Sequence, residues 1–274
     1  MPELPEVETI RRRLEPLVVG RRFETVEIKD ALLVRPSGPD EVAARLAGER
    51  VVALERRGKY LIVRFGSGRA LLVHLRMTGT LQHARNGLPE DPHRRALVHL
   101  DDGSRLAYRD VRRFGTWLLL EPGEVEPYLG ARLGGEPLGR PFTGRTLAAR
   151  LAGRRAPVKA ALLDQRTLAG LGNIYVDEAL WRARVHPLRP AGGLDEAEIR
   201  RLHRGVRGAL EAGLDRQGAT LRDYRTPDGT PGSAQDAFNV YGRAGEPCGR
   251  CRTPIEKIRV AGRGTWFCPR CQPG

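Results

Sequence analysis

Short apolar or alternating runs, separated by turn signals, dominate the first 120 residues of the chain. Alternation with a period of two predicts strands that bury one face, and tight turns such as "GSG" and "DDG" predict antiparallel neighbours. We therefore expect an antiparallel β-sandwich or barrel, preceded by an amphipathic helix with the apolar stripe Val7, Ile10, Leu14 and Leu17. The expected strands lie within residues 22–30, 50–65, 70–82, 96–110 and 114–121.

The period of the pattern changes near residue 130, where strands give way to helices. A glycine- and proline-rich stretch predicts a hinge, and the apolar spacing after it predicts helices within residues 145–153, 157–165, 173–185 and 194–218. The fold class is therefore α+β. We expect an N-terminal β-sandwich domain at 1–130, a hinge at 131–144, a helical domain at 145–242 and a cysteine-bearing domain at 243–274.

Composition and charge narrow the class of partner. The 274 residues carry 47 Lys+Arg and 33 Asp+Glu, a formal net charge of +14, and most of the basic residues are arginines spread along the chain. This balance suits a polyanion such as nucleic acid, although a generally basic surface would look the same. No apolar run reaches transmembrane length and no signal-peptide pattern is present, so we expect a cytosolic protein, monomeric by default.

Four cysteines give the firmest chemical signal. Cys248 and Cys251 form one CxxC knuckle, Cys268 and Cys271 form another, and no other cysteine occurs. This spacing predicts a four-cysteine site for one structural Zn²⁺ in a ribbon, with two disulfides as the alternative. The residues between the knuckles predict a hairpin with Arg263 at its tip, where it could bind phosphate or be a solvated turn residue.

A glycine-containing segment before Asn173 gives a second, weaker signal. Glycines at the start of a helix leave backbone N–H groups free to bind an anion. Asn173 alone would also serve as an ordinary N-cap.

The first residues pose a separate question. Helix initiation explains Pro5 and the early glutamates, but it does not explain Pro2. Pro2 matters chemically if Met1 is removed, because its nitrogen is then a secondary amine with a pKa low enough to be partly neutral near pH 7. Such an amine can act as a nucleophile.

The segments "PELPEVET", "RRGKYL", "HLRMTG", "RRFG", "LGNIYVDEAL" and "VYGRAGEPC", with the cysteine tail, together resemble the bacterial Fpg/Nei family of DNA glycosylases. The resemblance runs in order along nearly the whole chain, and "PELPEVE" is similar to the purine-repair branch. It implies a helix-two-turns-helix module and a zinc finger that bind damaged double-stranded DNA. It also implies a glycosylase and AP lyase for oxidised purines, such as 8-oxoguanine and formamidopyrimidines, in the cytoplasm at the nucleoid.

The resemblance assigns roles to individual residues. Pro2 is implied to be the nucleophile, Glu3 a proton donor to the opening sugar, Lys59 a general acid/base and Arg263 the phosphate-binding arginine of the second elimination. Read alone, Glu3 is a helix-start carboxylate and Lys59 is an outward lysine of an alternating strand. The residues implied to hold the DNA backbone are His74, His93, Arg112, Arg155, Lys159 and Asn173.

Flipping a nucleotide leaves a void in the duplex. Met77, Arg112 and Phe114 match the residues of the family that fill the void and wedge the bases, whereas core packing is the ordinary explanation for Met77 and Phe114. The chain departs from the family pattern at Arg76, where glycine is usual, and at Val111, where proline is usual. We therefore expect the loop geometry near the wedge to differ.

Two other functions fit parts of the pattern. One is a Nei-like glycosylase for oxidised pyrimidines. The other is a non-catalytic zinc-ribbon protein that binds DNA, which retention of Met1 would favour. The loop at 226–240 is implied to cover the flipped base, and its sequence assigns no base contact.

Overall fold

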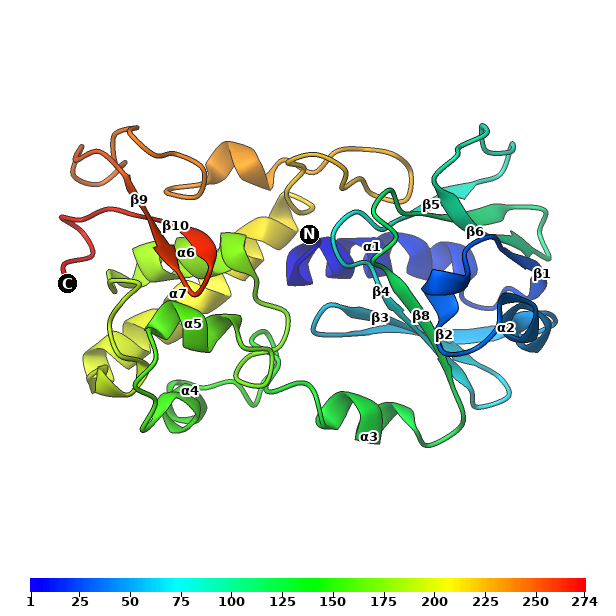
Figure 1. Ribbon diagram of the computed structural model, residues 1–274, viewed down its shortest axis with the longest axis horizontal. Coiled ribbons are helices and arrows are strands. Elements are labelled where there is room, and N and C mark those ends of the chain that lie inside the picture. Colours follow the sequence, from blue (N-terminus) through cyan, green and yellow to red (C-terminus); the bar gives the residue numbers. More distant parts are fainter. The chain divides into compact units, whose positions relative to one another are not determined.

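Two four-stranded antiparallel sheets form a β-sandwich, one of the two architectures that the alternating runs predict (Figure 1). The structure is a computed structural model that describes residues 1–274. One sheet has the order β1-β6-β7-β5 and the other β2-β3-β4-β8. The strands are β1 (Phe23–Ile28), β2 (Val51–Arg57), β3 (Tyr60–Phe65), β4 (Ala70–His74), β5 (Thr80–Ala84), β6 (Arg94–Leu100), β7 (Arg105–Arg109) and β8 (Thr116–Leu120).

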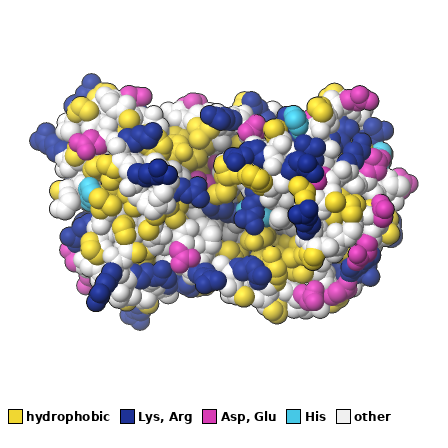
Figure 2. Space-filling view, viewed as in Figure 1, with side chains coloured by type: hydrophobic (Ala, Val, Ile, Leu, Met, Phe, Trp, Pro, Cys, Tyr) yellow, Lys and Arg dark blue, Asp and Glu magenta, His cyan; other side chains and the backbone are white.

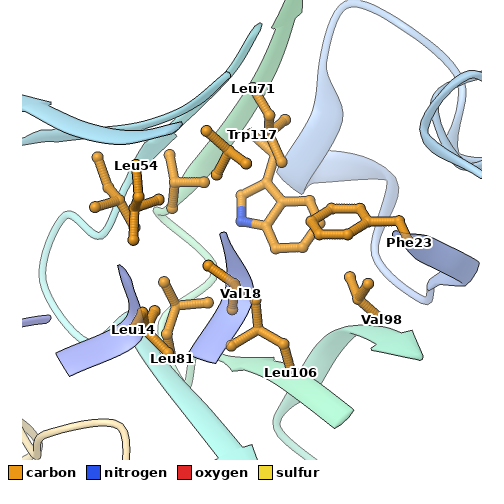
Figure 3. Close-up of a pocket in the computed structure, with 12 residues that line it drawn as sticks. Leu14, Val18, Phe23, Leu54, Leu71, Leu81, Val98, Leu106 and Trp117 are labelled. Atoms are coloured by element: carbon orange, nitrogen blue, oxygen red, sulfur yellow. The ribbon is translucent and has the colours of Figure 1, made fainter. Parts of the chain in front are cut away.

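The apolar face of helix α1 (Leu4–Val18) packs into the sandwich core. Leu14 and Val18 of this helix line the interior together with residues from both sheets, among them Phe23 and Trp117 (Figure 3). All residues that line this interior are apolar, so it holds the fold together and offers no group for chemistry. The predicted stripe is confirmed for Val7, Ile10 and Leu14, which are buried.

Three short helices of this region were not predicted: η1 (Ala31–Val34), α2 (Pro39–Leu46) and α3 (Val125–Gly130). The start of α2 carries Pro39 at its first position and Asp40 and Glu41 in its first turn, as the helix dipole favours. Only Val42 and Leu46 of α2 are buried, so its apolar stripe is short.

The chain divides into two units, which we call the first unit (1–131 and 216–233) and the second unit (132–215 and 234–274). The first boundary between the units lies between Ala131 and Arg132. Residues 216–233, which we had placed in the helical domain, cluster instead with the β-sandwich. They are held there by contacts such as Arg13 Nη2 to Gln217 Oε1 at 2.7 Å.

The second unit is helical, as predicted, and ends in a two-stranded hairpin. Helices α6 and α7 pack against each other, as the helix-two-turns-helix pattern requires. The hairpin turns at Ala261 and Gly262, whose φ angles of 48° and 75° allow a two-residue turn. The elements are α4 (Gly144–Leu151), α5 (Val158–Leu163), α6 (Asn173–Ala183), η2 (Ala191–Gly193), α7 (Glu196–Asp215), η3 (Ala234–Ala237), β9 (Glu256–Val260) and β10 (Arg263–Phe267).

None of the helices is both long and apolar enough to span a membrane. On the face shown in Figure 2, Lys and Arg side chains are spread over the surface of both units and outnumber Asp and Glu, in line with the net charge of +14.

Candidate active site

The start of α1 places Pro2 and Glu3 in a buried position of the first unit. Glu3 is the N-cap of α1 and forms a capping box with Glu6, whose Oε2 accepts the Glu3 N–H at 2.8 Å. The other oxygen of Glu6 accepts the N–H of Ala219 at 2.7 Å. One buried carboxylate therefore fixes both the N-terminus and the 216–233 segment.

Lys59 does not lie in a strand, as the alternating pattern predicted, but in the two-residue turn between β2 and β3. Gly58 takes a φ of 58° there, which favours glycine, and Arg57 pairs directly with Tyr60. Lys59 is only 5 % exposed. A lysine in a turn is normally solvated, so its burial distinguishes it from a surface charge.

The turn that carries Lys59 is tied to α1 by an ion pair. Arg56 donates from Nε to Glu8 at 3.1 Å and from Nη1 to the carbonyl of Gly58 at 2.9 Å. Burial raises the pKa of Glu8, but the hydrogen bonds from Arg11 and Arg12 and the charge of Arg56 outweigh it and hold the pKa below its usual range. Glu8 is thus ionised and joins the helix of Pro2 to the turn of Lys59.

His74 lies beside this turn. Its ring packs edge-on against Tyr60, with the centroids 4.7 Å apart, and its Nδ1 accepts the N–H of Arg76 at 3.1 Å. Burial, with the charges of Arg76 and Lys59, lowers the pKa of His74 to about 3. His74 is therefore neutral at physiological pH and can act only as a neutral hydrogen-bonding group.

The three proposed void-filling residues lie on two neighbouring loops of the first unit. Met77 is half-buried, whereas Arg112 and Phe114 are exposed, and Phe114 is 52 % exposed. The guanidinium of Arg112 lies 4.7 Å from the centroid of the Phe114 ring. The exposure of Phe114 argues against the core-packing explanation for that residue. His93, also in the first unit, is half-buried.

Arg76 adopts a φ of 52°, in the left-handed region. Glycine takes this conformation without strain, whereas a residue with a Cβ does not. The backbone at this position is therefore one that suits the glycine usual in the family, and arginine takes it at some cost.

In the second unit, Lys159 does not face solvent, which contradicts its expected contact with DNA phosphate. Its side chain is fully buried, and Nζ lies 2.7 Å from Asp177 Oδ1 and 3.0 Å from the carbonyl oxygen of Gly264. The other oxygen of Asp177 accepts the N–H of Trp266 at 3.1 Å. Burial raises the pKa of Asp177 to about 7, against the opposing charge and hydrogen bond of Lys159. This pair holds strand β10.

Asn173 begins α6, and the N-cap is Gly172. The amide of Asn173 also turns toward β10, where Nδ2 donates to the carbonyl of Gly264 at 2.9 Å. Arg263, the first residue of β10, is exposed beside the hairpin turn, and Arg155 is exposed as well. These two arginines remain available for phosphate.

The four cysteines converge at one point of the second unit. Their Sγ atoms all lie within 4.8 Å of one another, and Cys251 Sγ is 3.4 Å from Cys268 Sγ. Four thiolates at about 2.3 Å from a tetrahedral zinc ion are about 3.8 Å apart, so the arrangement fits this ion. Buried Glu178 accepts N–H bonds from Asn239, Val240 and Tyr241 just before the first knuckle, and so anchors the finger to α6.

From the sequence, Glu6 and Glu8 were explained only as acids at a helix start, and three other buried acids were not singled out, namely Asp110, Asp177 and Glu178. For the last two a signal was present, because both acids interrupt a strongly apolar helix segment, "NIYVDEALW". An acid surrounded by apolar residues on a buried helix needs a partner.

Comparison with known proteins gives a family match for each of three parts of the chain. Family models match the formamidopyrimidine-DNA glycosylase N-terminal domain at residues 1–117, the H2TH domain of the same glycosylase at 133–225, and a zinc finger found in FPG and IleRS at 245–274. A formamidopyrimidine-DNA glycosylase of Symbiobacterium thermophilum is 52 % identical over 100 % of this chain and 90 % of its own length. The one of Geobacillus kaustophilus is 49 % identical over 99 % and 100 %.

Solved structures agree with these matches. The structure of a Lactococcus lactis FPG mutant with Fapy-dG-containing DNA has a TM-score of 0.93 at 39 % identity and covers all of both chains. MutM (FPG) of Thermus thermophilus has a TM-score of 0.88 at 46 % identity, over 99 % of this chain and 98 % of its own. With the zinc-finger match and the thiolate geometry, the four cysteines hold one structural zinc ion.

Proposed function

Since the chain belongs to the formamidopyrimidine-DNA glycosylase family and is a base-excision repair glycosylase for damaged DNA, we propose that it excises oxidised purines and then cleaves the strand through an iminium on Pro2. Solved relatives hold DNA with Fapy-dG, with carbocyclic 8-oxo-G or with an abasic site, which supports this substrate class. The observation that carries the proposal is the buried Pro2–Glu3 start of α1 within a chain matched along its whole length.

The nucleophile in this mechanism is the Pro2 nitrogen after Met1 is removed, because in the longer chain that nitrogen is an amide. Its lone pair attacks C1′, and the bond from C1′ to the base breaks, so that the base leaves with the electron pair and takes up a proton. The amine then loses its proton, and the C1′–O4′ bond opens to give an iminium. A secondary amine has no second N–H to lose, so the iminium keeps its charge.

Strand cleavage follows from that charge. The iminium acidifies C2′–H, and loss of this proton forms an enamine that expels the 3′ phosphate. A second elimination expels the 5′ phosphate, and water then hydrolyses the adduct and frees the amine. Glycosylase and lyase steps thus share one nucleophile.

Three other groups handle protons and charge. Glu3, adjacent to the nucleophile, protonates O4′ as the ring opens. Lys59 is buried beside neutral His74, where an ammonium can stabilise phosphate charge and transfer a proton. Arg263 is exposed next to the turn of the zinc hairpin, where it can bind the leaving phosphate.

Borohydride trapping tests the proposal, because an iminium is reducible and a non-covalent complex is not. With duplex DNA that carries 8-oxoguanine, we expect a covalent adduct whose peptide map places the sugar on Pro2. Residues added ahead of Pro2 should abolish trapping while DNA binding persists. If the extended protein still traps, the nucleophile is another amine, with Lys59 the first to test.

Two further arms separate the remaining alternatives. Glu3→Gln should slow base excision strongly but spare more of the cleavage at a pre-formed abasic site, because that substrate has no base to expel. Matched duplexes with 8-oxoguanine or thymine glycol should be processed faster with the purine lesion. A faster reaction on thymine glycol would assign the enzyme to oxidised pyrimidines instead.

A further inference from the structure

The two loops that carry the void-filling residues meet at one buried carboxylate, Asp110, at the end of β7. Asp110 is 1 % exposed. The hydroxyl of Thr78, from the loop of Met77, donates to Asp110 Oδ1. The backbone N–H of Arg112 donates both to this hydroxyl at 3.0 Å and to Asp110 Oδ1 at 3.2 Å.

The second oxygen of Asp110 holds the far end of the segment from Arg112 to Gly115, which we call the wedge loop. Oδ2 accepts the N–H of Gly115 at 2.8 Å, so the segment from Arg112 to Gly115 is held at both ends by one carboxylate. Hydrogen bonds to a charged acceptor are stronger than hydrogen bonds between neutral groups. A buried carboxylate that loses one of its donors is destabilised, because no water replaces that donor. The wedge loop is therefore anchored by its backbone, independently of its side chains.

Both loops also approach the side chain of Tyr108 closely. A Cβ built on Gly79 would lie 2.4 Å from the Tyr108 hydroxyl oxygen, and one built on Gly115 would lie 1.7 Å from it. Both loops thus run directly against the hydroxyl end of this side chain, which is fully buried. No larger residue fits at either glycine without moving the loop.

Between the anchored ends, the side chains of the wedge loop point in different directions. Arg113 takes a φ of 59° and binds Asp30 with two hydrogen bonds of 2.8 Å. Its neighbours Arg112 and Phe114 stay exposed. The exposed aromatic ring therefore lies between Arg112 and Gly115, whose backbone N–H groups both donate to Asp110.

We propose that Thr78 and Asp110 are positioning residues that lock the two loops into one rigid unit, so that Met77, Arg112 and Phe114 enter the duplex together. The inference rests on the proposed function, because the void exists only after a nucleotide leaves the stack. Thr78 and Asp110 act through the loops and do not touch the reacting atoms. Extrusion of the nucleotide costs a few kcal/mol, and side chains that fill the void offset part of this cost. If these side chains are not held in place beforehand, extrusion of the nucleotide is slower.

The test compares Thr78→Val, which keeps the shape but removes the hydroxyl, with Thr78→Ser, which keeps the hydroxyl. On duplex DNA with 8-oxoguanine we expect Thr78→Val to excise about tenfold more slowly, the effect of one lost hydrogen bond to a charged group. Cleavage of a single-stranded abasic oligonucleotide, which has no void to fill, should change by less than about twofold. Thr78→Ser should stay close to the wild-type rate on both.

A second readout follows the wedge directly. With 2-aminopurine opposite the lesion, entry of the wedge into wild-type complexes should change the emission, and this change should be slower with Thr78→Val. Thr80→Val, which removes a buried threonine hydroxyl from β5 instead, is the matched control. Asp110→Asn keeps an acceptor oxygen for only one of the two backbone N–H groups, those of Arg112 and Gly115. It should therefore also slow excision on the duplex but not cleavage of the single strand. This variant replaces Thr78→Val in the test if Thr78→Val does not fold.

The possible results distinguish a failure of the positioning role from a failure of the proposed function. Equal rates for Thr78→Val and wild type on the duplex, or equal slowing on duplex and single strand, would overturn the positioning role. A wild-type protein that excises no base from any duplex would instead refute the proposed function.

Discussion

Replacing Lys159 with methionine should destabilise the second unit, and should do so more at high pH than at low pH. The ammonium lies 2.7 Å from Asp177 Oδ1, and neither side chain is exposed. Methionine fills a similar volume but leaves the carboxylate without its counter-charge. Removal of one partner from a buried ion pair costs about 3–5 kcal/mol.

The pH dependence follows from the carboxyl group of Asp177. Burial raises its pKa to about 7 in the folded protein, against about 3.9 in an unfolded chain. Between these values the folded state holds a proton that the unfolded state has lost, so the free energy of unfolding falls as pH rises. Without Lys159 the pKa rises further and the fall continues to higher pH. The cost of Lys159→Met should therefore be smaller at about pH 6, where Asp177 is protonated, than at about pH 9.

Hydrogen exchange of peptides that cover β9 and β10, in zinc-containing buffer, reports on the second unit by itself. A loss of about 3 kcal/mol speeds exchange by roughly 100-fold. The double variant K159M/D177N removes both charges but keeps an acceptor for the Trp266 N–H, so at about pH 9 it should lose less stability than Lys159→Met alone. Lys29→Met, at an exposed lysine, should change stability by less than about 0.5 kcal/mol. Exchange within about threefold of wild type for Lys159→Met at about pH 9 would refute the reasoning.

Three further outcomes follow from the site. Chelation of zinc, or Cys268→Ser, should unfold the zinc finger and weaken DNA binding but leave the β-sandwich folded. Near-ultraviolet circular dichroism follows the folding, and metal analysis follows the zinc content. Active protein without zinc would contradict this prediction. Arg263→Ala should reduce the slope of log affinity against log salt by about one, whereas Arg45→Ala, already paired with Glu41 and Glu121, should not. Arg76→Gly should raise the unfolding free energy by about 0.5–1 kcal/mol, measured by urea denaturation, because it relieves a positive φ; no gain would mean that the loop relaxes with arginine.

The architecture was predictable because the period of the apolar pattern is strong on both sides of residue 130. The missed helix α2 shows where that signal ends. Only two of its eight residues are buried, so its presence depends on caps and charges at its ends. The assignment of Lys59 to a strand failed for a related reason. The alternating pattern continues on both sides of a two-residue turn, and only Gly58 marks the interruption.

Motifs indicate the residues proposed for the chemistry, but they do not indicate the buried acids that support those residues. Glu8 reaches Arg56 across 48 positions, and Glu6 reaches Ala219 across 213. Nothing in the local pattern of either segment indicates its distant partner. In a chain with a charge of +14, an isolated acid reads as one more solvated surface charge. Only the tertiary structure shows that these acids are buried and that each connects two segments.

The choice between lysine and arginine carries information in this chain. Lysine occurs at only four positions, Lys29, Lys59, Lys159 and Lys257, and arginine supplies nearly all of the positive charge. Lys59 and Lys159 are buried, at 5 % and 0 % exposure. A guanidinium stays protonated at any accessible pH and is planar, whereas an ammonium is compact and can give up its proton when buried.

Each buried lysine therefore does something that arginine could not. At Lys159 the compact head fits between a carboxylate and a carbonyl oxygen, at 2.7 and 3.0 Å, in a space closed on every side. At Lys59 the proposed proton transfer requires an amine that can exist in both protonation states. Arg263 and Arg155 are exposed, and their proposed role of binding phosphate requires neither property, so arginine suits both positions. On the proposed mechanism, we therefore expect buried cations to organise the site or move protons and exposed cations to hold the DNA backbone.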